Sequence, residues 1–192
     1  MGKLFAKTLA IVISLGITPL TFAQWSVNSE KSILSFVTVK AEHVAEVHTF
    51  DQISGQVSEN GEVKVEVNLA SVNTMVPIRN ERMQAMLFET NLFPSATITA
   101  QVDVDKLGGM TVGDIESSSL DFELSLHGNR QSYTAEVLIA RMQNGVAVST
   151  RKPIIVSADS FGLAGGVEAL REVAGLPSIS KAVPVSFQLV ID

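Results

Sequence analysis

Apolar and polar residues alternate along most of the chain from Val63 onward. The alternation runs through residues 63–69, 98–104, 120–127 and 183–191, where every second residue is Val, Ile, Leu, Phe or Ala and the residues between are mostly polar. Successive side chains of a β-strand point to opposite faces, so this period predicts antiparallel strands with one dry face and one wet face. A dry face of this extent bounds either a packed core or a ligand cavity.

Turn residues separate the predicted strands. The strands are expected near residues 24–28, 32–40, 45–58, 62–70, 95–106, 110–116, 118–127, 131–141, 145–156 and 182–191. Between them lie the pairs Asn60-Gly61, Gly108-Gly109, Gly128-Asn129 and Asn144-Gly145, whose residues tolerate the positive φ of tight reversals. The pattern favours an up-and-down meander that closes into a single antiparallel β-barrel, although a Greek-key sandwich remains an alternative.

Two segments interrupt the alternation and are predicted to be helical. Between Pro77 and Phe88 the residues are strong helix formers, and Met83, Met86 and Leu87 fall on one side at helical spacing. Residues 166–174 show a second amphipathic pattern that Gly175 and Pro177 terminate. We expect such a helix to cover one end of the barrel with its apolar side inward.

The first residues have the pattern of a secretory signal. Lys3 and Lys7 precede an apolar run over residues 9–17, and Thr21-Phe22-Ala23 supplies a small-residue cleavage site before Gln24. The apolar run is too short and too interrupted to predict stable membrane insertion. We therefore expect a periplasmic or secreted protein in which residues 1–23 are removed and residues 24–192 form one barrel domain.

Composition excludes several classes of function. Removal of Lys3 and Lys7 with the signal changes the formal net charge from −6 to about −8, and the chain has no basic stripe that would predict a nucleic-acid partner. There is no cysteine, so disulfides, thiolate metal sites and cysteine nucleophiles are absent. The spacing of His43, His48 and His127 fits no metal site, and we expect surface imidazoles, no metal and no cofactor.

Glu46 and His48 form the most distinctive polar pair of the sequence. They stand two residues apart in a predicted strand and share a face with Val44 and Phe50. If Phe50 points inward, an acid and an imidazole do too, and Lys40, Arg79 or Arg82 would then supply a partner charge. The alternative places the pair at a wet barrel mouth or on the outer face.

Catalysis is a rival interpretation of the same pair. Glu46 and His48 have the chemistry of an acid and a base, but a triad also needs a nucleophile and an orienting group. The chain has no Gly-x-Ser-x-Gly elbow, no His-Glu-x-x-His and no phosphate-binding loop, and the glycine-rich residues 162–166 lack the lysine of a P-loop. The sequence therefore favours a binding protein over an enzyme.

Several segments, in order, resemble the YceI-like family. They are residues 36–55, the first helix leading into Phe93-Pro94-Ser95-Ala96-Thr97-Ile98, the turn Leu124-Ser125-Leu126-His127-Gly128, and Asp159-Ser160-Phe161-Gly162. The resemblance implies an exported, lipocalin-like barrel, and some members of the family bind polyisoprenoid or other long amphiphilic lipids. It covers essentially the whole chain after the signal.

The chain departs from the family pattern at three places. Val39-Lys40 stands where many members have arginine and histidine, His48-Thr49-Phe50 stands in place of Gly-x-Phe, and Arg79-Asn80-Glu81-Arg82 replaces a common run of aspartate, histidine and leucine. These changes put polar groups where the head of a ligand would lie.

The resemblance and the residue pattern together predict a non-catalytic carrier, store or sequestering protein for a hydrophobic or amphiphilic small molecule, isoprenoid or fatty-acid-like. The expected apolar lining is Phe36, Phe50, Met83, Met86, Leu87, Phe88, Phe122 and Phe187. The expected contacts of the polar head are Lys40, Glu46, His48, Arg79 and Arg82. Two alternatives are an exported stress-related enzyme or inhibitor that uses Glu46 and His48, and a ligand-free structural module whose barrel is full.

Overall fold

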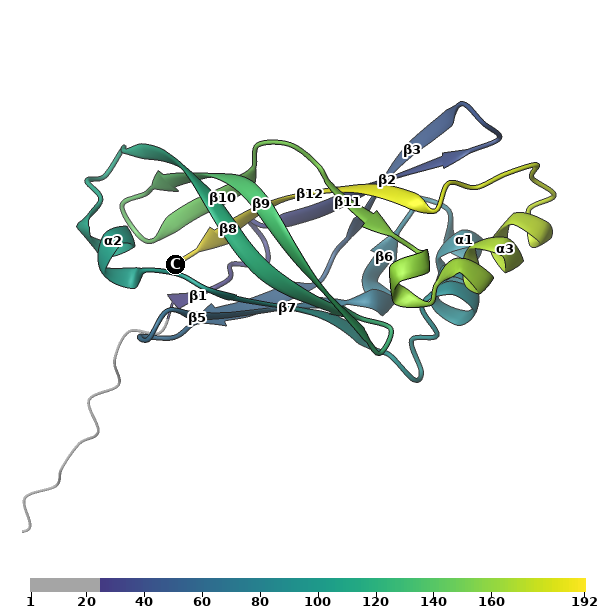
Figure 1. Cartoon of the computed structure of the whole chain (residues 1–192), viewed down its shortest axis with the longest axis horizontal. Helices are drawn as coiled ribbons and strands as arrows, with labels where there is room; N and C mark the ends of the chain where they lie inside the picture. The colour runs from purple at the N-terminus through teal and green to yellow at the C-terminus, as the bar shows by residue number, and fades with distance from the viewer. Residues whose placement is uncertain (1–24) are drawn as a thin grey trace, which may run out of the picture.

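One curled antiparallel sheet accounts for most of the protein (Figure 1). A computed structural model describes residues 25–192, so the expected signal segment and its cleavage between Ala23 and Gln24 lie outside the described residues. Over the described part, twelve strands form a single sheet, with helices at its two ends. The predicted fold class, a single all-β, lipocalin-like barrel with short helices, is confirmed.

The strands follow the predicted alternation in most places. In chain order they are β1 Trp25–Ser26, β2 Ile33–Lys40, β3 Val44–Phe50, β4 Ile53–Val57, β5 Glu62–Asn68, β6 Val72–Asn73, β7 Ser95–Gln101, β8 Ile115–Leu126, β9 Asn129–Arg141, β10 Val146–Thr150, β11 Ile154–Ser157 and β12 Ala182–Ile191. The helices are α1 Pro77–Arg82, α2 Val104–Gly109 and α3 Ala164–Val173, a π-helical turn η2 Met83–Leu87 that continues α1, and the 3-10 turns η1 Leu69–Ser71 and η3 Asp159–Phe161.

Sequence-adjacent strands pair as the turn residues predict. β4 pairs with β5 around Asn60-Gly61, β8 with β9 around Gly128, and β9 with β10 around Asn144-Gly145. The last strand, β12, pairs with β10 and with β2. The polar faces of these strands point outward and their apolar faces point toward the inside of the curl.

The N-terminal strand joins the two sides of the curled sheet. The Val27 N–H donates a hydrogen bond of 2.9 Å to the carbonyl of Gly55 in β4. Val27 also forms a β-bridge with Ile191 of β12. The Asn28 N–H donates to the Val190 carbonyl at 2.8 Å. These bonds link β4 to β12 at the α2 end, whereas at the opposite end the β2–β3 hairpin projects beyond the body (Figure 1).

Helix α2 lies where the sequence pattern predicted strand. The alternation that ends with Val102 and Val104 suggested one strand over 95–106 and another over 110–116, with a turn at Gly108-Gly109. Instead the Asp103 carboxylate caps a helix by accepting a hydrogen bond from the Lys106 N–H at 2.9 Å. N-cap side chains of this kind stabilise a first helical turn by about 1 kcal/mol, enough to override a short strand pattern. The two glycines end α2, and β8 begins only at Ile115.

Two predicted strands are each divided in the structure. Residues 45–58 form β3 and β4, separated at Asp51 and Gln52, because β3 pairs with β2 while β4 turns to pair with β5. Residues 145–156 likewise form β10 and the start of β11.

The predicted helices are found at α1 with η2 and at α3. Within residues 25–192, none of the helices combines the length and apolarity needed to cross a bilayer.

Candidate functional site

The α1 and α3 end of the barrel encloses the larger of two apolar cavities, with a volume of about 460 Å³. Its walls are the inward faces of β2, β3, β5, β7, β8 and β12, and η2 and α3 cover it. Its lining is almost entirely aliphatic and aromatic, apart from one polar cluster. That cluster consists of Thr38, Lys40, Glu46, His48, Arg79 and Arg82.

The polar cluster arises from two facing strands. Every second residue of β2, including Phe36, Thr38 and Lys40, lines the cavity, and so do Glu46 and His48 of β3. The β2–β3 register places Phe36 opposite His48 and Thr38 opposite Glu46. Directly opposed side chains of an antiparallel pair contact each other, so the charged residues gather toward the hairpin and the apolar ones continue into the barrel.

Glu46 joins two cations at the mouth. One of its carboxylate oxygens, Oε2, lies 2.8 Å from the Lys40 Nζ and 2.7 Å from the Arg79 Nη1. All three side chains are a third exposed or less. The hydrogen bond from Lys40 holds the pKa of the Glu46 carboxyl below its ordinary value, and Arg79 adds to the effect. Glu46 is therefore ionised at neutral pH, and the three groups carry a net charge of one positive unit.

A braced loop holds the Arg79 side chain in place. Arg79 donates from Nη2 to the Thr74 carbonyl at 2.6 Å, while the Thr74 N–H and hydroxyl both donate to the Asn80 Oδ1, at 2.9 and 2.6 Å. The next residue, Met75, has a φ of 60°, a conformation that costs a non-glycine residue roughly 1 kcal/mol or more. The hydrogen bond that Arg79 donates and the two that Asn80 accepts offset that strain and fix the guanidinium at the mouth.

His48 is the buried polar residue of the cavity, with 4% of its surface exposed. Its Nε2 lies 3.0 Å from the Thr38 hydroxyl, and its ring stands edge-on to Phe36 with centroids 5.3 Å apart. Burial lowers the pKa of the imidazole, and the positive charge of Arg79 lowers it further. His48 is therefore neutral at neutral pH, and it is not the surface imidazole that the sequence suggested.

Seven of the eight expected apolar residues line a cavity, but they are divided between two cavities. Phe36, Phe50, Met83, Leu87 and Phe88 line the larger cavity. Phe122 and Phe187 line a second cavity instead. The aromatic rings of the larger cavity form a row from the polar cluster inward, with Phe36–Phe50 and Phe50–Phe88 centroid distances of 5.2 and 5.7 Å.

Met86 is the exception, because it lines neither cavity. The sequence predicted an ordinary α-helix that would align it with Met83 and Leu87. In the structure the Phe88 N–H bonds to the Met83 carbonyl at 2.9 Å, the i to i+5 spacing of a π-helical turn. The wider turn brings Met83, Leu87 and Phe88 to the cavity and leaves Met86 aside.

Glycine allows α3 to close over η2. A Cβ atom at Gly166 would lie 2.6 Å from the Met86 carbonyl oxygen and 2.8 Å from the Leu87 Cα, both of which are backbone atoms that cannot turn aside. Val167 and Leu170 of α3 then reach the cavity lining. The cover over this end therefore depends on one residue without a side chain.

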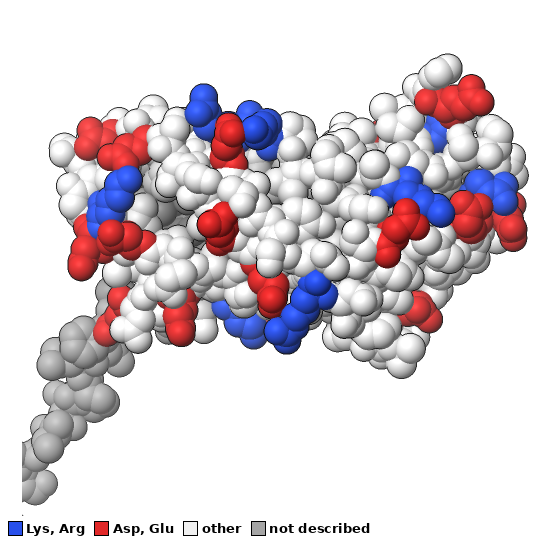
Figure 2. Space-filling view, viewed as in Figure 1, with Lys and Arg blue, Asp and Glu red and all other residues white. Residues whose placement is uncertain are grey.

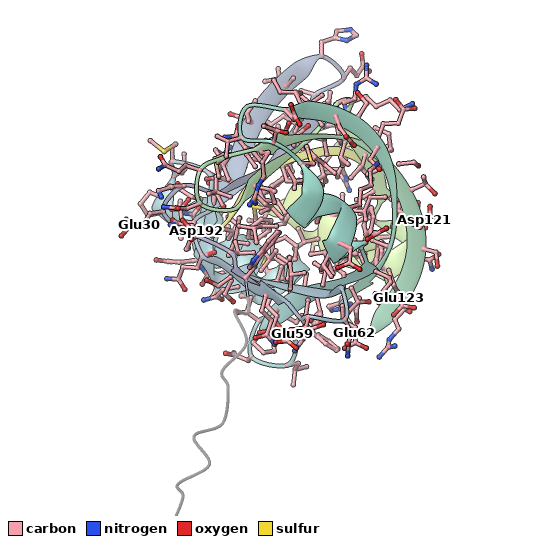
Figure 3. The ribbon with its side chains drawn as sticks, turned by 90° about the vertical axis from the view of Figure 1, so that its left-hand side faces the viewer. Glu30, Glu59, Glu62, Asp121, Glu123 and Asp192 are labelled. Carbon is pink, nitrogen blue, oxygen red and sulfur yellow. The ribbon has the colours of Figure 1, made fainter. Side chains whose placement is uncertain are left out.

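The second cavity, with a volume of about 280 Å³, lies at the α2 end. Five side chains belong to the walls of both cavities and form the partition between them: Leu34, Ile98, Leu124, Val156 and Val185. Viewed from this end, the sheet curls around α2, and the labelled acidic residues lie on the outside of the ring (Figure 3). Polar groups line this cavity chiefly where α2 meets the sheet, where the Lys106 Nζ lies 3.0 Å from a Glu116 carboxylate oxygen.

The remaining histidines are separated from His48. His43 is exposed at the β2–β3 hairpin, and His127 bonds to Glu89 at 2.8 Å and packs on the Phe93 ring. Among residues 25–192, no three His, Asp or Glu side chains gather as potential metal ligands. On the face shown in Figure 2, acidic and basic side chains are interspersed, without a continuous basic stripe.

Arg82 takes a different position from the other candidate head-group residues. It is exposed at the cavity rim and forms no ion pair within the described part of the chain. The sequence pattern did not single out Thr38 or Thr74, and it gave Asn80 only as one of the polar residues of the run 79–82. Thr38 could have been found because it alternates with Phe36 and Lys40, whereas nothing in the sequence signals that Thr74 and Asn80 bond to each other and position Arg79.

Comparisons with known proteins agree with this architecture. A model of the YceI-like domain matches residues 25–191. A solved polyisoprenoid-binding domain from Saccharophagus degradans, implicated in plant cell wall breakdown, is 36% identical, with a TM-score of 0.86 over 88% of this chain and 97% of that one. No curated protein matches the chain.

Two more distant structures share the fold. BcnA from Burkholderia cenocepacia is 18% identical, with a TM-score of 0.65 over 85% of this chain and 98% of its own. The YceI protein of Campylobacter jejuni is 14% identical, with a TM-score of 0.54 over 76% and 84% of the two chains. The extent of the domain match and the 36% identity over nearly all of a solved relative show that this chain belongs to the YceI-like family.

Proposed function

We propose that the protein binds a hydrophobic or amphiphilic small molecule, isoprenoid or fatty-acid-like, inside its barrel and carries, stores or sequesters it without transforming it. The apolar tail lies in the larger cavity, and the polar head lies at the cluster around Lys40, Glu46 and Arg79. The polyisoprenoid-binding domain of S. degradans, the relative with 36% identity, supports this class of ligand.

The observation that carries the proposal is the combination of an apolar cavity of about 460 Å³ with a charged cluster at one place on its wall. In a ligand-free structural module we would expect side chains to fill this volume, because protein interiors are packed to the density of organic crystals. Burial of apolar surface contributes roughly 25 cal/mol per Å², so a long tail supplies most of the affinity and the cluster orients the head.

The arrangement of Glu46 and His48 favours binding over catalysis. Glu46 bonds to Lys40 and Arg79, and the His48 Nδ1 has no hydrogen-bond partner within the described residues. The Thr38 hydroxyl and the His48 imidazole are adjacent, but a hydroxyl nucleophile needs a base that a third group orients. Glu46, the acid of the enzyme hypothesis, is instead paired with Lys40 and Arg79.

Export forms a second part of the proposal, supported by the sequence of residues 1–23. A periplasmic or secreted location would bring the barrel to lipids of the cell envelope or the exterior. N-terminal sequencing of protein recovered from the export compartment should find Gln24 or a near neighbour first. Recovery of a chain that still begins with Met1 would contradict export by cleavage.

The direct test of binding is native mass spectrometry of protein purified from its own compartment. We expect an additional mass that organic extraction removes and that returns when the extract is added back. Protein treated identically after denaturation and refolding in lipid-free buffer is the control for non-specific adducts. A clean protein mass before extraction, together with no uptake of added farnesol, would contradict the proposal.

A further inference from the structure

Exposed apolar side chains gather around the mouth of the larger cavity. Within residues 25–192, eleven large hydrophobic side chains are exposed, and six of them belong to three segments at this mouth: Val44, Val47, Met75, Val76, Ile78 and Val173. We call these six side chains the apolar rim. Isolated exposed hydrophobic residues are ordinary, but a group of them marks an interaction surface.

Hydrogen bonds hold the three segments around one opening. Arg79 of α1 donates to Glu46 of the β2–β3 hairpin at 2.7 Å. The Ala41 N–H of the same hairpin donates to the Ser178 carbonyl, in the loop after α3, at 3.0 Å. The hairpin, α1 and the end of α3 therefore lie together at the end of the molecule opposite α2 (Figure 1).

The most exposed member of the rim, Met75, is held outward by its loop. Its side chain and backbone together are 85% exposed. Its N–H donates to the Asn73 Oδ1 at 3.0 Å, and the preceding residue, Thr74, is buried and bonded to Asn80. Since Met75 also has a φ of 60°, the fold keeps an apolar side chain in water in a conformation that is itself unfavourable. Such an arrangement points to a partner for that side chain.

The apolar rim continues into the cavity without a polar barrier. Val76, Ile78 and Ala174 are exposed at the surface, and they also belong to the cavity lining. An apolar tail could therefore move between an outside hydrocarbon phase and the cavity along an apolar surface. This continuity favours a lipid phase over a protein as the partner, since a lipid phase is also the source of the proposed ligand.

The charges of the mouth fit a zwitterionic surface. The three segments, residues 36–50, 73–82 and 166–181, contain five Lys or Arg and five Asp or Glu, although residues 25–192 carry a net charge of −8. The nearby Asp51 and Asp159 change the local sum only to −2. Zwitterionic head groups present phosphates and ammonium groups side by side, so both signs of charge at the mouth find partners there. The excess acidic charge lies mostly elsewhere on the protein.

We propose that the apolar rim docks the protein reversibly on the surface of a zwitterionic phospholipid bilayer, with the cavity mouth toward the lipid. Met75, Val47 and Val173 enter the head-group region, and the ligand passes between the bilayer and the cavity. This inference rests on the proposed function and adds the partner with which the ligand is exchanged.

The test measures co-sedimentation of the purified protein with vesicles of phosphatidylcholine and phosphatidylethanolamine. The rim variant and its matched control each replace three exposed apolar residues that line neither cavity: Met75→Asn, Val47→Thr and Val173→Gln in the rim variant, and Val112→Thr, Ile115→Thr and Ile155→Thr in the control. Asparagine tolerates the positive φ of Met75. Residues 1–24 are the same in all the proteins, so a difference between variants reports on the rim.

We expect the wild type to bind these vesicles and the rim variant to bind roughly tenfold more weakly or less, because three apolar side chains no longer enter the bilayer. The control should differ from the wild type by less than about twofold. Raising the salt from about 0.1 to about 0.5 M should also have less than a twofold effect, since the docking is not driven by net charge. Titration calorimetry in vesicle-free buffer should give all three proteins the same farnesol affinity within about threefold.

Equal vesicle binding by the rim variant and the control, or no vesicle binding by a wild type that binds farnesol, would overturn the docking and leave the proposed function intact. Ultracentrifugation without lipid adds a further check: a wild-type dimer that the rim substitutions dissociate would assign the rim to a second copy of the chain instead. Absence of farnesol binding in vesicle-free buffer would overturn the proposed function itself. Thermal melting verifies folding, and if the triple rim variant unfolds, Met75→Asn alone should still weaken vesicle binding measurably, and an unchanged affinity would overturn the docking.

Discussion

The two cavities of the barrel share a wall but differ in what surrounds them. The larger one has a cluster of polar side chains on its wall, most of them buried or half-buried and joined to one another by hydrogen bonds and ion pairs, and a helical cover formed by η2 and α3. The smaller one has polar groups mainly at its rim, where the exposed Lys106 and Glu116 pair with each other. One end of the barrel is therefore equipped to orient a ligand, and the other is a continuation of the apolar interior. The difference teaches that, under the proposed function, the residues available to recognise a head group are a few side chains of β2, β3 and α1.

The largest expected effect concerns the inward register that forms both cavities. Val67 and Val65, two residues apart on β5, are buried in the walls of the larger and the smaller cavity, respectively. We expect Val67→Asp and Val65→Asp each to lower the free energy of unfolding by about 3 kcal/mol or more, because an unpaired charge would enter dry surroundings.

Lys64→Asp, on the outward side of the same strand, is the matched control and should cost less than about 1 kcal/mol. Urea unfolding measures all three variants. If the inward and outward substitutions lowered stability equally, the assignment of the strand faces would be wrong.

The next effect separates the two cavities by their role in binding. Ala96 and Ala100 lie on the same face of β7, Ala96 in the larger cavity and Ala100 in the smaller one. We expect Ala96→Phe to weaken the binding of farnesol at least tenfold, because the ring would occupy the tail site, and Ala100→Phe to weaken it less. Titration calorimetry on the two folded variants measures the difference. A stronger effect of the Ala100 substitution would transfer the principal site to the α2 end.

A third effect is the pH dependence that His48 adds to stability. Its pKa is lowered in the folded protein, mainly by burial, so below about pH 6.5 the unfolded chain takes up a proton that the folded chain refuses. Stability should therefore fall as the pH falls from 7 toward 5, by at most about 1.4 kcal/mol per pH unit from this residue.

His48→Gln should flatten that slope, while His43→Gln, at the exposed hairpin, should leave it unchanged. Urea unfolding at pH 7, 6 and 5 provides the comparison. Parallel pH profiles for the wild type and His48→Gln would show that the imidazole is solvated in the folded protein.

The smallest expected effect is at the rim of the smaller cavity. Lys106 and Glu116 are both about half exposed, and exposed ion pairs contribute little because water and salt screen them. Lys106→Met should change the free energy of unfolding by less than about 1 kcal/mol and leave farnesol affinity unchanged. A tenfold loss of affinity in this variant would reveal a polar recognition site at the α2 end.

The alternation of the strands predicted the barrel, because a side-chain period of two is a local property of the sequence. It also brought Glu46 and His48 to one face, although the period could not decide which face was inside. That decision came from Phe36 and Phe50, which pack together in the core once β2 and β3 pair. Which residues of two strands come to face each other leaves no trace in the sequence of either strand alone.

The features that the sequence did not predict depend on small local energies or on distant partners. A single Asp103 cap converted an apparent strand into α2, and one π-helical turn displaced Met86 from the cavity. The positions of Thr74 and Asn80 follow from a loop with positive φ at Met75, in which the Asn80 Oδ1 accepts hydrogen bonds from Thr74 and the Asn73 Oδ1 accepts one from the Met75 N–H. The two-cavity interior depends on which side chains meet at its centre, and no pattern within one strand specifies this.

The most direct test of the central claim is the heat-capacity change when farnesol binds to lipid-free protein, measured by titration calorimetry at several temperatures. Burial of an apolar tail in the larger cavity predicts saturable one-to-one binding with a negative heat-capacity change, the most robust marker of apolar burial. Ala96→Phe should greatly reduce or abolish that signal. Binding that does not saturate, or a heat-capacity change near zero with full binding by Ala96→Phe, would contradict the assignment of the larger cavity as the ligand site.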